Sequence, residues 1–106
     1  LSDLTNKKTL VNFTKLELNR ILSNYSNGVI KGYWKDYAID QTGDISIFSI
    51  YRNSQERPTF CLEKKRKGAS QVLNFTLWHG PKVLENSTSL EKVLKRLNSL
   101  PKIIRR

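Results

Sequence analysis

The hydrophobic and polar positions of the chain first follow a helical period. Apolar side chains recur at i, i+3, i+4 and i+7, which is typical of one face of an amphipathic helix. Residues 14–17 (Thr-Lys-Leu-Glu) form a capping box before this stripe, and residues 26–28 (Ser-Asn-Gly) favour a left-handed C-cap after it. We therefore expect a helix over residues 14–26. Its apolar positions are Leu18, Ile21, Leu22 and Tyr25.

From residue 33 to residue 85 the pattern changes to the alternation and the β-branched and aromatic composition of strands. Residues 45–52 (Ile-Ser-Ile-Phe-Ser-Ile-Tyr-Arg) are apolar on both faces, as in a central strand covered on at least one side. Polar turns separate the runs. The expected strands are residues 33–41, 45–52, 59–65 and 71–79, with a short fifth strand at 82–85.

A second helical stripe closes the pattern. Residues 88–91 (Thr-Ser-Leu-Glu) are another capping box, and Pro101 ends the helix that we expect to follow. The sequence therefore predicts an α+β fold with an N-terminal helix, an antiparallel meander of four or five strands, and a C-terminal helix packed on the sheet. The second stripe consists of Leu90, Val93, Leu94 and Leu97.

A length of 106 residues suits one domain, which we place at residues 13–100. We expect a loose N-terminal arm over residues 1–12 and a basic tail over residues 101–106. No apolar run approaches the ~20 residues of a membrane helix, and no signal-peptide pattern opens the chain. Because the chain begins at Leu1 rather than at methionine, we expect it to be trimmed from a longer one.

Charge narrows the class of partner. The net charge is +10, and residues 54–106 carry twelve basic and four acidic side chains against seven and five in residues 1–53. This asymmetry favours a polyanionic partner, which could be nucleic acid, an acidic protein or an anionic membrane surface. The alternative is that the charge serves solubility alone.

The strongest basic signal is the run of four cations at residues 64–67, which can hold a phosphate backbone. Aromatic side chains in neighbouring strands can stack on unpaired bases. We therefore expect contact with single-stranded RNA or DNA, although no RNP, KH or helix-turn-helix motif is present. The expected nucleic-acid-binding residues are Lys64, Lys65, Arg66, Lys67, Lys92, Lys95, Arg96, Trp34 and Trp78.

The aromatic residues also support a competing hypothesis. Aromatic and apolar residues fall on both faces of the expected strands, since Ile45, Ile47 and Tyr51 alternate with Phe48 and Ile50. If the helices cover only one face of the sheet, an aromatic face therefore stays uncovered, whichever face that is. An uncovered aromatic face is typical of a protein-interaction surface. The chain would then be a protein-interaction module or a homodimer.

Catalysis is not indicated. Cys61 and His79 are the one cysteine and the one histidine, and nothing in their spacing brings them together as nucleophile and base. Asp36 and Asp40 would lie about 13 Å apart along a strand, farther than a catalytic carboxylate pair. The glycines are isolated, and no metal-binding spacing occurs. We therefore expect a non-enzymatic protein without metal or cofactor, in which Cys61 is a small core residue and His79 a surface residue.

Several motifs together resemble a known family. They are Trp34-Lys35-Asp36-Tyr37-Ala38-Ile39-Asp40, Phe48-Ser49-Ile50-Tyr51-Arg52, Ser54-Gln55-Glu56-Arg57-Pro58 and Leu62-Glu63-Lys64. With Glu17-Leu18 and the Leu-rich helix, this set resembles the alphaproteobacterial domain-of-unknown-function family 2794 over roughly residues 13–97, departing from it after Lys64. The resemblance implies a bacterial cytoplasm, consistent with a single reduced cysteine, and supplies no mechanism.

Overall fold

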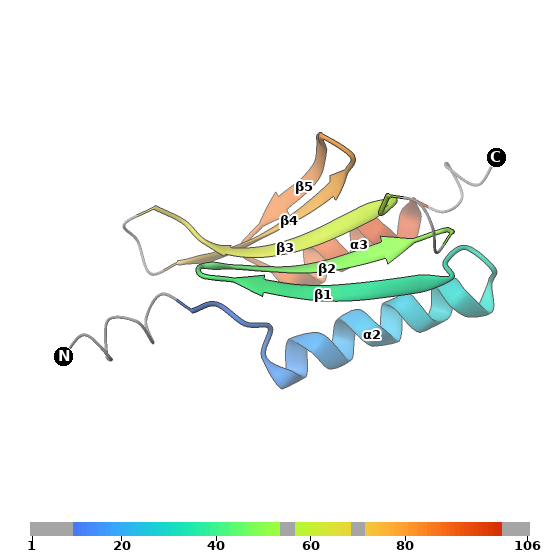
Figure 1. The fold of residues 1–106 in the computed structure, drawn as a ribbon, viewed down its shortest axis with the longest axis horizontal. Coiled ribbons are helices and arrows are strands. Elements are labelled where there is room, and N and C mark those ends of the chain that lie inside the picture. The colour runs from blue at the N-terminus through green and yellow to red at the C-terminus, as the bar shows by residue number, and fades with distance from the viewer. Residues whose placement is uncertain (1–9, 54–56, 69–71, 101–106) are drawn as a thin grey trace.

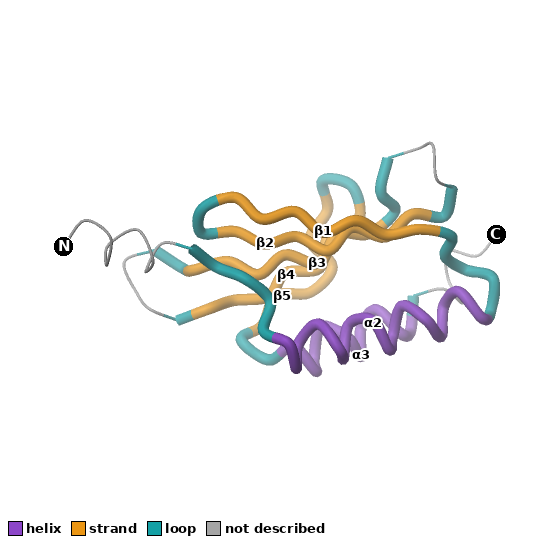
Figure 2. Tube along the Cα trace, turned by 60° about the horizontal axis from the view of Figure 1, so that its bottom comes forward, coloured by secondary structure: helices purple, strands orange, loops and turns teal. Residues whose placement is uncertain are grey.

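The computed structural model describes residues 10–53, 57–68 and 72–100, which form two helices and one antiparallel sheet. Its strands are hydrogen-bonded in chain order, β1-β2-β3-β4-β5. Helices α2 (Lys15–Ile30) and α3 (Leu90–Ser99) lie against the same face of the sheet (Figures 1 and 2). The α+β fold predicted from the sequence is confirmed. The strands are β1 (Asp36–Thr42), β2 (Ile45–Tyr51), β3 (Phe60–Arg66), β4 (Leu73–His79) and β5 (Lys82–Ser87).

The core lies between the sheet and the two helices. Because side chains alternate along a strand, every second residue of the central strands faces the helices and is buried there. Both predicted helical stripes face the same layer, and full burial of each large apolar side chain contributes about 1.5–3 kcal/mol. The core includes Ile21 and Tyr25 of α2, Phe48 and Ile50 of β2, Phe60 and Leu62 of β3, Phe75 and Leu77 of β4, and Val93, Leu94 and Leu97 of α3.

The other face of the sheet has no helix over it among the described residues (Figure 2). We call it the open face. The strand registers place Trp78 beside Cys61 and Val83 on this face, and Ile47 and Tyr51 belong to it by alternation along β2. Most of these side chains are half-buried, so the open face exposes only part of its apolar surface.

Helix α2 is longer than predicted, because the Ser-Asn-Gly run at residues 26–28 does not end it. Gly28 is helical and buried, and the helix continues to Ile30 with Lys31 as its C-cap. The left-handed position belongs instead to Gly32, at φ 81°. A side chain at Gly28 would collide with Trp34, so this glycine permits close packing and does not stop the helix.

Other boundaries also differ from the sequence pattern. β1 begins at Asp36 rather than at residue 33, because Trp34 leaves the strand path and enters the core. β5 extends to Ser87. The N-cap of α3 is Ser89, whose hydroxyl accepts from Lys92 N–H, and not Thr88, as the second capping box had predicted.

The end of the expected N-terminal arm is held against the sheet. Val11 is buried, its N–H donates to Gly43 O at 3.0 Å, and its carbonyl accepts from Ser46 Oγ at 2.6 Å. The segment thus crosses the β1–β2 turn before α2 begins. Residues 1–9 of the arm and the basic tail at 101–106 lie outside the described residues.

Gly28→Ala should destabilise the protein by about 1–3 kcal/mol through overpacking. The new Cβ would lie 1.7 Å from Trp34 Nε1, and the buried indole cannot swing aside. At an ordinary helical site the same change would stabilise by roughly 1 kcal/mol. Urea unfolding measures the difference, with Ser26→Ala at an exposed position of α2 as the matched control. A variant as stable as the wild type would contradict this packing.

Candidate nucleic-acid interface

Three of the predicted cations gather where β3 meets β4. Lys65 pairs with Asn74 across the two strands, and Arg66 pairs with Leu73. The Lys67 N–H donates to Val72 O at 3.0 Å, which continues the pairing by one residue. Alternation directs Lys65 to the open face, and both Lys65 and Lys67 are exposed. The hairpin therefore holds these cations at one end of the sheet (Figure 1).

A hollow of about 290 Å³ lies beside these cations. Polar side chains of β4 and β5 form one wall: Asn74 Nδ2 donates to Asn86 Oδ1 at 2.9 Å, and Asn86 Nδ2 donates to Thr76 Oγ1 at 2.6 Å. The carboxylate of Glu63 also lines the hollow. The arrangement offers positive charge and hydrogen-bonding groups to an anionic, polar ligand. We call it the hairpin surface, with Lys65, Arg66, Lys67, Asn74, Thr76 and Asn86 as its residues.

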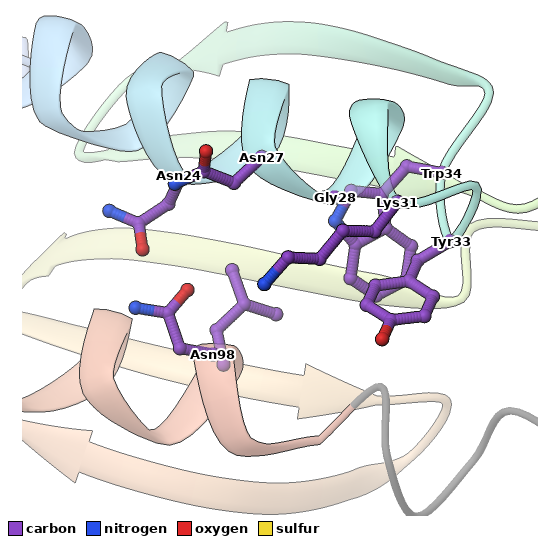
Figure 3. A pocket seen from close by; sticks show the side chains of 8 residues that line it. Asn24, Asn27, Gly28, Lys31, Tyr33, Trp34 and Asn98 are labelled. Carbon is purple, nitrogen blue, oxygen red and sulfur yellow. The ribbon is translucent and has the colours of Figure 1, made fainter.

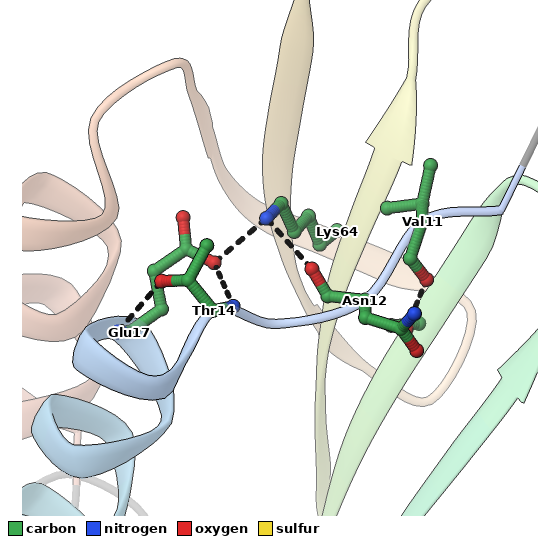
Figure 4. Close-up of polar contacts among 6 residues, drawn as sticks. Val11, Asn12, Thr14, Glu17 and Lys64 are labelled. Carbon is green, nitrogen blue, oxygen red and sulfur yellow. Dashed lines mark hydrogen bonds and ion pairs between the residues drawn. The ribbon is translucent and has the colours of Figure 1, made fainter. Parts of the chain in front are cut away.

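Lys64, the first cation of the predicted run, points the other way. Its side chain is 3% exposed, and its Nζ donates to Glu17 Oε1 at 2.7 Å and to Asn12 O at 2.8 Å (Figure 4). The same Nζ lies 5.9 Å from the centre of the Phe75 ring. The expectation that Lys64 contributes to an exposed basic surface is therefore wrong, because even-numbered positions of β3 face the helices. The same alternation directs the half-buried Arg66 away from Lys65.

The two tryptophans also separate. Trp34 is 5% exposed and packs edge-on against Phe60, with 5.4 Å between the ring centres. It therefore cannot stack on a base without leaving the core, contrary to the sequence prediction. Trp78 is half-buried on the open face, on the same strand as Asn74 of the hairpin surface. Trp78 is thus the one predicted tryptophan that reaches solvent.

The predicted cations of α3 belong to the opposite side of the molecule. Lys92 and Lys95 are exposed and Arg96 is half-buried, on a helix that covers the face opposite the open one. The structure therefore does not bring them together with the hairpin surface.

Arg20 of α2 forms an ion pair with Glu91 of α3, and together with Ser23 and Asn24 they line a hollow between the two helices. A second pocket lies where the end of α2 and the residues after it approach the end of α3. Sequence periodicity did not indicate either pocket, because their residues come from the flanks of both helices and from the segment that follows α2. Figure 3 shows this second pocket, with the Lys31 side chain extending towards α3. Its amide, cationic and aromatic lining comprises Asn24, Asn27, Lys31, Tyr33, Trp34 and Asn98.

Residues considered for catalysis lie apart. Cys61 faces the open side, half-exposed, with its Sγ 3.7 Å from Ser49 Oγ, so it is not the core residue we expected. His79 is on the helix side, half-buried, with its Nδ1 2.8 Å from Thr59 O, rather than on the surface as expected. The described residues contain no group of three or more His, Cys, Asp or Glu side chains that could hold a metal ion.

The carboxylates considered for catalysis lie on the edge strand β1. Asp36 and Asp40 are both exposed, and Asp36 Oδ1 accepts from Tyr37 N–H at 2.8 Å. Tyr25 of α2 lies on the helix side of β1, and its burial raises the pKa of its hydroxyl above the usual value. The charge of Asp36 and, to a smaller extent, that of Tyr37 raise this pKa further. Tyr25 therefore stays protonated and neutral at physiological pH, as a core residue should.

Glu17→Gln should destabilise the protein more than Lys64→Met. Glutamine preserves the capping box with Thr14 but leaves a buried ammonium without its carboxylate, which costs about 3–5 kcal/mol for a fully buried pair and less here because Glu17 is 23% exposed. Methionine removes the buried charge and retains its packing. Denaturant unfolding of both single variants and the double variant measures the coupling. Equal losses for the two single variants would contradict the assignment of Lys64 as a buried charge.

Comparison with known proteins agrees with the sequence motifs. Neither the curated proteins nor the solved structures contain a match to this chain. A family model described as "Protein of unknown function (DUF2794)" matches residues 11–94. This range begins at the buried Val11 and ends inside α3, so it spans the whole sheet, all of α2 and the first half of α3. The resemblance inferred from the motifs is confirmed, and the chain belongs to the DUF2794 family of proteins of unknown function.

Proposed function

We propose that the protein is a non-enzymatic binding module that contacts single-stranded nucleic acid through the hairpin surface. The observation that carries this proposal is the hollow lined by Lys65, Arg66 and Lys67, where the exposed Lys65 and Lys67 meet a wall of amides and a hydroxyl. Phosphates supply most of the affinity of such contacts through cations, and amides can hydrogen-bond base edges. Glu63 is the one carboxylate among the lining residues, so positive charge prevails there.

The position of Trp78 favours single-stranded over double-stranded nucleic acid as the ligand. It is four residues from Asn74 on β4, about 13 Å along the strand, and lies on the same face as Lys65. A chain with a phosphate beside Lys65 can therefore lay a nearby unpaired base on the exposed part of the indole. Stacking of this kind contributes about 1–3 kcal/mol per base and does not require sequence-specific contacts.

The proposal includes a bacterial, cytoplasmic location and the absence of catalysis. Cys61 is a free thiol, which suits a reducing compartment. Cys61 and His79 project from opposite faces of the sheet, so they do not form a nucleophile–base pair in this fold. None of the helices in the described part of the chain is long and apolar enough to cross a bilayer.

The double variant Lys65→Glu/Lys67→Glu should weaken binding to a labelled single-stranded oligonucleotide at least about 10-fold, because two phosphate contacts become repulsive. Lys92→Glu/Lys95→Glu is the matched control. It changes the net charge equally, at exposed positions of α3 on the other side of the molecule. Fluorescence anisotropy near 50 mM salt measures both affinities.

The salt dependence is a second readout. Two phosphate contacts, from Lys65 and Lys67, should lower the wild-type affinity about 7-fold between roughly 50 and 200 mM salt, at ~0.7 per contact for single strands. Equal losses for the two double variants would indicate attraction by net charge alone and would refute the hairpin surface as the site. No binding at the lower salt concentration would refute the function.

A second candidate function is self-association through the open face. The observation in its favour is that both helices cover the opposite face, leaving Ile47, Tyr51 and Trp78 partly exposed. A two-fold contact would bury this face against its own copy, as in most homodimers. The hairpin surface adjoins the same face, so a dimer would compete with nucleic acid for it.

Ile47→Lys tests the second candidate. If the open face is a dimer interface, the variant should raise the dissociation constant at least about 10-fold, because each copy would bury a charge in place of an apolar side chain. Leu16→Lys is the matched control at an exposed position of α2. Sedimentation velocity over a range of concentrations measures the association. A wild-type protein that is monomeric throughout this range would refute the candidate.

A further inference from the structure

The edge strand β1 presents unpaired backbone groups to solvent. A turn of two residues, Gly43 and Asp44, joins β1 to β2 and closes on the pair Thr42↔Ile45. In such a hairpin every second residue back along the strand bonds to its partner, and the residues between them turn their N–H and C=O groups outward. On β1 the outward residues are Tyr37, Ile39 and Gln41.

Two contacts support this assignment. On the far side of β2, Ile50 O accepts from Thr59 N–H at 2.7 Å, so the even-numbered residues of β2 bond to β3. On β1, the outward N–H of Tyr37 donates to the side chain of Asp36. No hydrogen bond between described residues reaches the N–H groups of Ile39 and Gln41. A sixth strand could therefore bond to β1.

An apolar surface lies under this edge. Tyr37 and Ile39 project to the helix side and are 41% and 44% exposed. Helix α2 lies beside β1 (Figure 1). The ring of its Tyr25 is 5.0 Å from that of Tyr37. The flank of α2 that carries Leu22 and Val29 continues this apolar surface.

The helix period places that flank at the edge. Leu22 and Val29 lie two and nine residues from Arg20, which at 3.6 residues per turn puts them on the opposite side of α2. Arg20 faces α3, and α3 packs under β4 and β5. The flank of Leu22 and Val29 therefore points beyond β1, under the position of an added strand. We call Leu18, Leu22, Val29, Tyr37 and Ile39 the edge surface.

Charge selects the occupant. On the open side of β1, Asp36 and Asp40 are exposed, Asp44 follows in the turn, and no cation lies on the strand itself. A second copy pairing through β1 would bring both acidic strands together on one face, where like charges repel. A strand with lysine or arginine at alternate positions would instead pair its cations with these carboxylates. Its intervening apolar side chains would rest on the edge surface.

The opposite edge of the sheet is different. The pairing of β5 with β4 has a register shift between Leu77 and Trp78, and α3 packs against β5. A bulge and a covering helix are two ways in which proteins protect sheet edges from pairing. β1 has neither.

We propose that the β1 edge and the edge surface bind an extended peptide segment of a partner protein in which basic and apolar residues alternate. The segment adds a sixth strand, with its backbone bonded to Ile39 and Gln41, its apolar side chains against α2, and its cations beside Asp36 and Asp40. This site is separate from the hairpin surface.

The test uses a synthetic peptide of the seven-residue length of β1, with lysine and valine alternating. A peptide with the same composition arranged in blocks, and one with glutamate in place of lysine, are the controls. The alternating peptide should bind and slow hydrogen exchange at the amides of Ile39 and Gln41. Asp36→Asn/Asp40→Asn should weaken this binding roughly 2- to 30-fold, the range of two cross-strand ion pairs, whereas Lys65→Glu/Lys67→Glu should not weaken it.

Ile39→Pro probes the backbone. Proline removes an N–H that β2 does not use, so the sheet should form and peptide binding should be lost; Ile39→Ala, which retains the N–H, is the control. Should the proline variant not fold, hydrogen exchange on the wild-type protein still decides.

Four results would overturn the proposal. They are no binding of the alternating peptide, equal affinity for the block peptide, protection at residues away from β1, or amides of Ile39 and Gln41 already protected without peptide. In the last case, protection that rises with protein concentration identifies a second copy as the occupant. Protection independent of concentration and lost on deleting residues 1–9 or 101–106 identifies this chain's own termini.

Discussion

The buried ion pair between Lys64 and Glu17 holds the two layers of the protein in one arrangement. Lys64 is in the central strand, Glu17 is in the first turn of α2, and the ammonium also bonds to Asn12 O in the preceding segment. One oxygen of Glu17 accepts from both Lys64 and the Thr14 N–H, so capping and docking of α2 depend on one carboxylate (Figure 4). A misplaced helix would leave a charge in the core without a partner, which is far more costly than a lost apolar contact.

This docking determines which surfaces exist. With α2 fixed beside β1 and α3 beneath β4 and β5, the helices cover one face, and the other face carries the hairpin surface. The same placement brings the α2 residues of the edge surface next to the unpaired edge of β1. Gly28 and Trp34 fix the position of α2 at its C-terminal end. Because Gly28 has no side chain, the helix can lie directly against the indole of Trp34.

The sequence predicted the order and type of every element in the described part of the chain, because amphipathic stripes and strand alternation are local signals. It failed where a tertiary contact overrides a local one. From the sequence alone, Gly28 indicates a helix end, and only its contact with Trp34 shows that the helix continues. Thr88 and Ser89 are both good N-cap residues, so composition cannot decide which of them caps α3. At the site, four adjacent cations look equivalent, yet alternation in β3 sends Lys64 inward and Lys65 outward. The strand phase that decides this depends on pairing with β2 and β4.

A net charge of +10 therefore describes the chain and not its surfaces. The run at residues 64–67 loses one cation to the core, and α3 carries others to the far side of the molecule. Meanwhile the carboxylates of β1 make that edge acidic within a basic protein. Screening limits each exposed charge to about 10 Å at ordinary ionic strength, so a ligand at the hairpin surface and a strand at the β1 edge experience fields of opposite sign. The two proposed sites thus select partners of opposite charge, a difference that the net charge of the whole chain does not reveal.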